Sequence, residues 1–386
     1  MAEEKTMAKN NKGRVKTNNS GASVLALADD QERSRLFQLP QELRDSIYDH
    51  LFLDTRVSHG RRPLGEVKCL RITPAPNSLS LLKTCRRARA EIGHSWLSQV
   101  LFNFEDVKTM MEKLTAVPLR TLSAIRHLCV RGHSLTLSCP EKKMYYNLVH
   151  GLKFLPGLQL DTLTVLNLYG NCVTYDVLNS LIKYGQGWRE LRYISRRSDI
   201  LQYVNDFIIL QGFDDYNQRR QRKPQPANWI RTMNSRDGAA NQPSVAIYRS
   251  TLPGTTCTVI NEATRVRFEQ ECPEPSQEAL FGGRACASCM SSGENAKELM
   301  VIVRRGNGVD YQEKQRPPLL PEIGDIRADC PGMTWEEISK KHFAPPSDSG
   351  NADRCFGNDS SDHAPEKMDE YRHVEEYEWT PLKSEY

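Results

Sequence analysis

The stretch LTVLNLY, residues 163–169, decides the fold together with YDVLNSLIKY, which follows it at 175–184. The first has the apolar run of a short buried strand, and the second has the period of a helix, with Thr174 as its N-cap and Gly185 at its exit. Two more strand candidates, AIRHLCV (124–130) and LRYIS (191–195), alternate with helix candidates at 144–155 and 198–210. Such alternation predicts α/β units with a partly parallel sheet over residues 119–213.

A module of short helices is predicted before this sheet, over residues 35–115. In LFQLPQELRDSIYDHLF (36–52), Pro40 stands where a helix begins. The apolar residues Leu43, Ile47 and Leu51 recur every four positions and predict one buried stripe. A second helix is expected after residue 78, and EDVKTMMEKL (105–114) has the spacing of a third, amphipathic helix.

The sequence after the sheet region divides into three parts. Residues 214–228 have the composition of a linker, and residues 229–312 are β-rich, either as a small separate unit or as strands that extend the preceding sheet. Residues 313–386 form an acidic, largely disordered tail with one short helix near 334–343, opened by a Thr334–Glu337 capping box. We expect this short helix to be a docking helix, with Trp335 and Ile338 as its contact residues.

Residues 1–34 are expected to be disordered. The fold class is therefore mixed α+β with disordered ends.

Charge is distributed unevenly along the 386 residues. The net charge is +4, but the segment from residue 313 onward has 17 acidic and 9 basic residues, so the preceding part carries +12. A basic body with an acidic tail can bind nucleic acid, or the tail can fold back on the body, and solvated surfaces are the alternative. Apart from RRQRK at 219–223 the basic residues are dispersed, which makes nucleic acid an unlikely partner.

Composition also bears on location and chemistry. No apolar run reaches the roughly 18 residues of a membrane span, and the eleven irregularly spaced cysteines favour reduced thiols in the cytoplasm or nucleus. The glycine-rich phosphate-binding motifs, G-x-S-x-G and H-E-x-x-H are missing, so we expect no enzyme and no cofactor. Cys286 and Cys289 form a C-x-x-C pair that is a weak zinc candidate, and inert thiols are the favoured interpretation.

Two segments carry a resemblance to known proteins. FQLPQELRDSIYDHLF (37–52), followed by SLSLLKTCRRARAEIGHSWLSQVLFNF (78–104), resembles the F-box-like domain of fungal proteins through its Leu-Pro-x-Glu-Leu opening and its Leu-Leu-x-Thr-Cys-Arg segment. The resemblance covers about 70 of the 386 residues. LDTLTVLNLYGN (160–171) is similar to a leucine-rich repeat.

The resemblance implies a non-catalytic adaptor that holds the Skp subunit of a cullin-RING ubiquitin ligase and an unknown protein substrate. It places the Skp contacts at Leu39, Pro40, Leu43 and Ile47 in the first helix, and at Leu82 and Cys85 later in the module. Physically this is recognition of a helix in a groove through apolar anchors. Alternatively, the insertion between Phe52 and Leu79 makes the module a self-contained fold. In that case Leu43, Ile47 and Leu51 are core residues and do not bind a partner. The sequence also leaves open a scaffold without a ligase role and a nuclear protein associated with nucleic acid.

Overall fold

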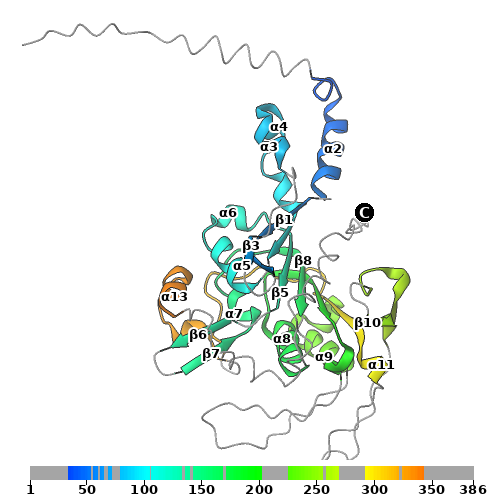
Figure 1. Ribbon diagram of the computed structural model, residues 1–386, viewed down its shortest axis with the longest axis vertical. Helices are drawn as coiled ribbons and strands as arrows, with labels where there is room; N and C mark the ends of the chain where they lie inside the picture. The colour runs from blue at the N-terminus through cyan, green and yellow to red at the C-terminus, as the bar shows by residue number, and fades with distance from the viewer. Residues whose placement is uncertain are drawn as a thin grey trace, which may run out of the picture.

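The computed structural model describes residues 34–342, with gaps at 54, 60, 65–67, 72–78, 105, 133–134, 140–141, 168–170, 202–224, 255–257, 269–291 and 321–323. Its centre is an eight-stranded sheet (Figure 1). In spatial order the strands are β1 (Arg56–His59), β4 (Leu101–Phe104), β5 (His127–Arg131), β8 (Leu160–Asn167), β9 (Trp188–Ser195), β12 (Lys297–Arg304), β10 (Ser244–Pro253) and β11 (Arg265–Phe268).

The parallel part of the sheet confirms the mixed fold class. Strands β1, β4, β5, β8 and β9 pair in parallel, so the three strands expected from the sequence, β5, β8 and β9, are direct neighbours. Strands β1 and β4 come from the N-terminal region of short helices. That region therefore shares the sheet with the α/β region.

The β-rich segment extends the same sheet instead of forming a unit of its own. Strand β12 pairs antiparallel with β9, and β10 pairs antiparallel with both β12 and β11. The segment also contains a helix that the sequence analysis missed, α9 (Ala227–Asp237), in which Trp229 and Met233 are buried. A short 3-10 helix, η3 (Ala239–Asn241), follows α9.

The helices after β4 pack their apolar residues into one large core. They are α5 (Val107–Leu114), α6 (Leu119–Leu122), α7 (Leu148–Leu152), α8 (Asn171–Tyr184), η2 (Ser198–Leu201), α9, α12 (Ile326–Asp329) and α13 (Trp335–His342). Helix α5 follows its prediction closely, because its four apolar residues are buried and Asp106 caps it, with Oδ1 accepting from the Thr109 amide at 2.6 Å. The remaining short helices, η4 (Glu262–Thr264) and α11 (Ser292–Asn295), lie beside β10.

One of the predicted helices is partly a hairpin. Residues 142–146 form β7 (Lys142–Tyr146), which pairs antiparallel with β6 (Leu135–Cys139), and only Leu148–Leu152 is helical. The apolar residues Tyr146 and Leu148 are both buried, so the change from strand to helix at Asn147 keeps the apolar pattern intact. Of the predicted helix at 198–210, only the 3-10 turn η2 lies within the described residues.

Within the expected acidic tail, the described residues 313–320 and 324–342 include several that are packed onto the body. Glu313 is fully buried, and its carboxylate oxygens accept from Lys153 Nζ at 3.1 and 3.2 Å. Further along, Ile326 and Ile338 are fully buried in the main core. A buried ion pair with the body gives this acidic segment a defined place. Residues 1–33 and 343–386, which the sequence assigns to disorder, lie outside the described part.

Candidate functional site: the N-terminal helical module

The candidate site is built on helices at one end of the molecule. Helix α2 (Gln41–Leu53) stands beside α3 (Ser80–Thr84) and α4 (Arg86–Ile92), beyond β1 (Figure 1). A hairpin of β2 (Arg61–Leu64) and β3 (Lys68–Arg71) follows β1. Between α3 and α4 the chain is extended at Cys85, whose Sγ accepts from the Ala88 amide at 3.4 Å and so caps α4.

An ion-pair network centred on Glu91 of α4 holds α2 in place. Arg44 Nε and Nη2 each donate to a carboxylate oxygen of Glu91 at 3.0 Å. Tyr48 Oη donates to the same carboxylate at 3.2 Å, and Arg87 Nε donates at 3.2 Å. Because the Arg44 contact is bidentate, it fixes the rotation of α2 about its own axis as well as its distance from α4.

The network changes the pKa values of Glu91 and Tyr48. Burial opposes ionisation of Glu91, but the hydrogen bonds from Arg44, Arg87 and Tyr48 outweigh it, so the pKa of Glu91 is lowered. Burial and the neighbouring Glu91 charge raise the pKa of Tyr48 to about 12. At neutral pH, Glu91 is therefore an anion that accepts from three donors on α2 and α4.

Aromatic contacts connect the module to the sheet. The ring of Phe37 lies 4.7 Å from the Arg87 guanidinium carbon and 5.9 Å from that of Arg44, in cation–π range. The ring centroids of Phe52 and Trp96 are 6.5 Å apart, and those of Trp96 and Phe102 are 6.2 Å apart. Trp96 belongs to the 3-10 helix η1 (Ser95–Ser98) and Phe102 to β4, so the base of α2 is packed against the sheet.

The expected apolar stripe of α2 faces solvent. Leu43 is 53% exposed, Ile47 is 44% exposed and Leu51 is 38% exposed. The prediction of a buried stripe at these positions is therefore wrong. The helix instead buries Arg44, Tyr48 and Phe52, which also recur every four residues and lie one position further along. The stripe of Leu43, Ile47 and Leu51, which we call the α2 stripe, is the largest group of exposed apolar side chains on any described helix.

The other expected contact residues divide into two groups. Pro40 is exposed and Leu39 is half-buried at the start of α2, next to the α2 stripe in the chain. Leu82 and Cys85 are half-buried and pack against the main core, so they support the module more than they extend its apolar surface.

Among the residues that the structure describes, the remaining sequence candidates do not form a second site. Trp335 and Ile338 of α13 are buried, and the Trp335 ring lies 6.2 Å from that of Phe154 in an edge-on arrangement, so this helix docks on its own chain. Cys286 and Cys289 lie outside the described residues. Within the part that the structure describes, no three His, Cys, Asp or Glu side chains are grouped as a metal site requires.

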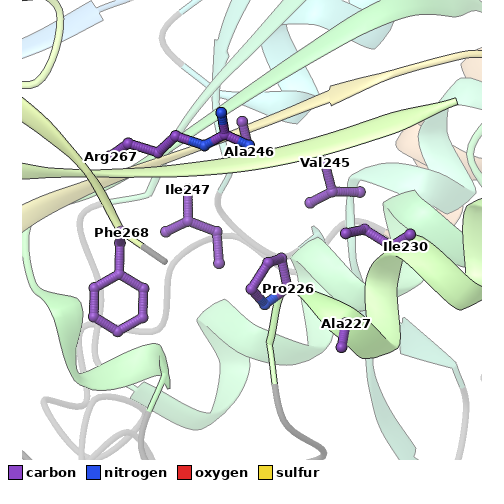
Figure 2. A pocket seen from close by; sticks show the side chains of 8 residues that line it. All are labelled: Pro226, Ala227, Ile230, Val245, Ala246, Ile247, Arg267 and Phe268. Carbon is purple, nitrogen blue, oxygen red and sulfur yellow. The ribbon is translucent and has the colours of Figure 1, made fainter. Parts of the chain in front are cut away.

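A small apolar pocket lies between α9 and the edge of the sheet. Its volume is about 240 Å³, and Figure 2 shows the side chains that line it, from the start of α9, from β10 and from β11. Arg267 is the one titratable side chain among the eight that line the pocket. An active site brings several titratable groups together, and this lining does not.

Comparisons with protein-family models, with curated proteins and with solved structures found no match to this chain. Among the described residues, no helix has both the length and the apolar character that crossing a membrane requires.

Proposed function

We propose that this chain is a non-catalytic adaptor that binds a Skp-type subunit of a cullin-RING ubiquitin ligase through the α2 stripe, and holds a protein substrate elsewhere on its surface. The observation that carries the proposal is the exposure of Leu43, Ile47 and Leu51 on a helix that the rest of the module holds firmly. The same residues belong to the segment that resembles an F-box-like domain, and this resemblance is the reason for proposing a Skp-type subunit as the partner.

The firm attachment of α2 favours this use of its surface. Arg44, Tyr48 and Phe52 fix one side of the helix, and the α2 stripe lies next to that side. A partner that docks there therefore orders few new side chains, which lowers the entropic cost of binding. Apolar anchors at positions i, i+4 and i+8 are the recognition pattern of a helix laid in a groove.

The stripe by itself is too small for a stable complex. Each of its side chains is already about half buried, so docking gains about 1 kcal/mol for each one, which is about half of the 1.5–3 kcal/mol that full burial of such a side chain contributes. Three such gains fall well short of the roughly 8 kcal/mol of a micromolar complex. We therefore expect the partner to contact Leu39 and Pro40 as well, at the exposed start of the helix.

Co-purification of the full chain with a Skp-type subunit tests the proposal. The variant Leu43→Asp/Ile47→Asp places two charges on the α2 stripe, and Ser46→Asp is its matched control at an exposed position of the same helix. We expect the double variant to lose the subunit while its thermal unfolding stays close to wild type, and the control to retain the subunit.

Two outcomes contradict the proposal. If the double variant still retains the subunit, the α2 stripe is not the contact. If the wild-type chain retains no Skp-type subunit at micromolar concentration, the ligase role is lost and a scaffold of another kind replaces it.

A further inference from the structure

The first described residues, 34–40, form a turn that leads directly into α2. Within this turn, the Phe37 amide donates to the Ser34 carbonyl at 3.0 Å. The Arg44 amide donates to the Pro40 carbonyl at 3.2 Å, so the turn ends where the hydrogen bonding of the helix begins. We call residues 34–40 the entry turn.

The last residue of the entry turn lies in line with the α2 stripe. Pro40 precedes Leu43 by three positions and Ile47 by seven, which is the spacing of one side of a helix. Pro40 is exposed, and Leu39 before it is half-buried. The entry turn therefore extends the apolar surface of α2, but only while its backbone keeps this position relative to the helix.

The Arg44 side chain joins the entry turn to both helices. Its Nη1 donates to the Leu39 carbonyl at 2.5 Å. Its Nη2 donates to the Gln41 side-chain oxygen and, at 3.0 Å, to Glu91 of α4, which also accepts from Nε at 3.0 Å. Three nitrogens of one guanidinium thus hold the end of the entry turn, the start of α2 and α4 in one arrangement. Arg44 is only 7% exposed, so it contributes little to the surface that a partner meets.

A second arginine, Arg87, has a similar chemical environment but a different position. The guanidinium carbons of Arg44 and Arg87 lie 5.9 and 4.7 Å from the ring of the buried Phe37 in the entry turn. Both arginines also donate to the Glu91 carboxylate. Arg87 belongs to α4, whereas Arg44 belongs to α2 and binds the backbone of the entry turn. Arg87 is therefore a close chemical control for Arg44.

We propose that Arg44 is a positioning residue for partner binding, which holds Leu39 and Pro40 in line with the α2 stripe without touching the partner itself. This inference rests on the proposed function. The α2 stripe alone falls short of a micromolar complex, so the contacts of Leu39 and Pro40 are needed. They add affinity at a low entropic cost when the entry turn is ordered before the partner docks.

The geometry of the guanidinium makes this role specific to arginine. Arginine presents several N–H donors in a planar fork, whereas lysine presents one ammonium at the end of a flexible chain. A lysine at position 44 keeps the positive charge near Glu91, but a single nitrogen cannot reach the Leu39 carbonyl and both Glu91 oxygens at the same time. Arg44→Lys should therefore release the entry turn while the charge of the module stays the same.

Two matched variants of the full-length chain, Arg44→Lys and Arg87→Lys, test the proposal. Each replaces one guanidinium beside Glu91 and Phe37 with an ammonium. Titration calorimetry measures their affinity for a purified Skp-type subunit. Amide hydrogen exchange, followed by mass spectrometry in peptides from the entry turn, α4 and β8, measures their local order without the partner. The exchange measurement therefore reports on the entry turn even if no complex forms.

We expect Arg44→Lys to weaken binding at least about tenfold, because fixing the backbone of even one released residue costs about that factor in affinity. Its entry turn should exchange at least about tenfold faster than in the wild type, with α4 and β8 unchanged. Arg87→Lys should keep the affinity within about threefold, since its ion pair with Glu91 is partly exposed and contributes little.

A double-mutant cycle separates positioning from a general loss of stability. Leu39→Ala should cost less affinity in the Arg44→Lys background than in the wild type, because the entry turn has then already lost its fixed position. If Arg44 acted only on overall stability, the two losses in affinity would multiply.

Four results overturn the proposal: equal affinities of Arg44→Lys and Arg87→Lys, losses that multiply in the cycle, an entry turn that stays as protected in Arg44→Lys as in the wild type, or an α4 that exchanges as much faster as the entry turn does. The last result would make Arg44 a residue of the module's fold alone. A wild-type chain that binds no Skp-type subunit removes the proposed function, and that failure is visible before any variant is compared.

Discussion

The proposed function depends on which side of α2 is packed in the core. Two alanine substitutions, one on each side of the helix, measure how much each side contributes to the free energy of unfolding. Phe52 is fully buried, and Ile47 is 44% exposed. Phe52→Ala removes a packed ring next to Trp96 and leaves a cavity, at a cost of about 3–5 kcal/mol. Ile47→Ala removes three carbons that are about half in contact with water, so at about 0.8 kcal/mol per buried methylene we expect a loss of about 1 kcal/mol.

Urea denaturation followed by tryptophan fluorescence measures both changes, since Trp96 contacts Phe52 directly. We expect the unfolding midpoint of Phe52→Ala to fall several times further than that of Ile47→Ala, with similar slopes for both variants. If Ile47→Ala destabilises the chain as much as Phe52→Ala does, the α2 stripe is part of the core and its proposed role in binding is refuted.

Three further changes test other parts of the structure. Glu313→Gln leaves the Lys153 ammonium buried without a counter-charge and should cost about 3–5 kcal/mol in thermal or urea unfolding, whereas Lys153→Met/Glu313→Leu should recover most of that loss. Burial opposes ionisation of Glu190, but Arg192 and its neighbours outweigh it and lower its pKa from 4.5. The resulting stability is present above pH 4.5 and is lost as the pH falls through the lowered pKa. Glu190→Gln should therefore reduce the loss of stability on the acid side of a stability–pH curve. An acid side that is the same in the variant and the wild type contradicts this. Asp106→Ala removes the cap of α5 and should cost about 1 kcal/mol, while an unchanged melting temperature contradicts the capping geometry.

Local sequence patterns were sufficient for the central strands. Strands β5, β8 and β9 are short apolar runs separated by helix signals, and they pair in parallel as expected. Helix α5 is equally well determined, because its cap and its apolar spacing lie within ten residues. In these elements the information that selects the structure is local.

The orientation of α2 was not available from local patterns. Leu43, Ile47 and Leu51 have the same spacing as Arg44, Tyr48 and Phe52, and only the first set is uniformly apolar. The second set is buried because Glu91, which is 47 residues from Arg44, neutralises the arginine and accepts from the tyrosine. A pairing over that distance leaves no periodic signal in the sequence.

Long-range packing also explains two other differences between expectation and structure. Helix α9 has a polar composition, and its one local signal is the spacing of Trp229 and Met233, four residues apart on one buried side. Residues 313–342 are acidic in composition, yet the partner of Glu313 is Lys153, 160 residues earlier. Such segments are assigned to a tail when only their composition is considered, because composition gives no information about which distant residue a side chain pairs with.

The affinity of the full-length chain for a purified Skp-type subunit, measured by titration calorimetry, tests the central claim most directly. We expect a dissociation constant in the micromolar range or below for the wild type and for Ser46→Asp, and a loss of at least about a hundredfold for Leu43→Asp/Ile47→Asp, about 2.7 kcal/mol. Equal affinities for the wild type and the double variant would contradict the claim that the α2 stripe is the binding surface.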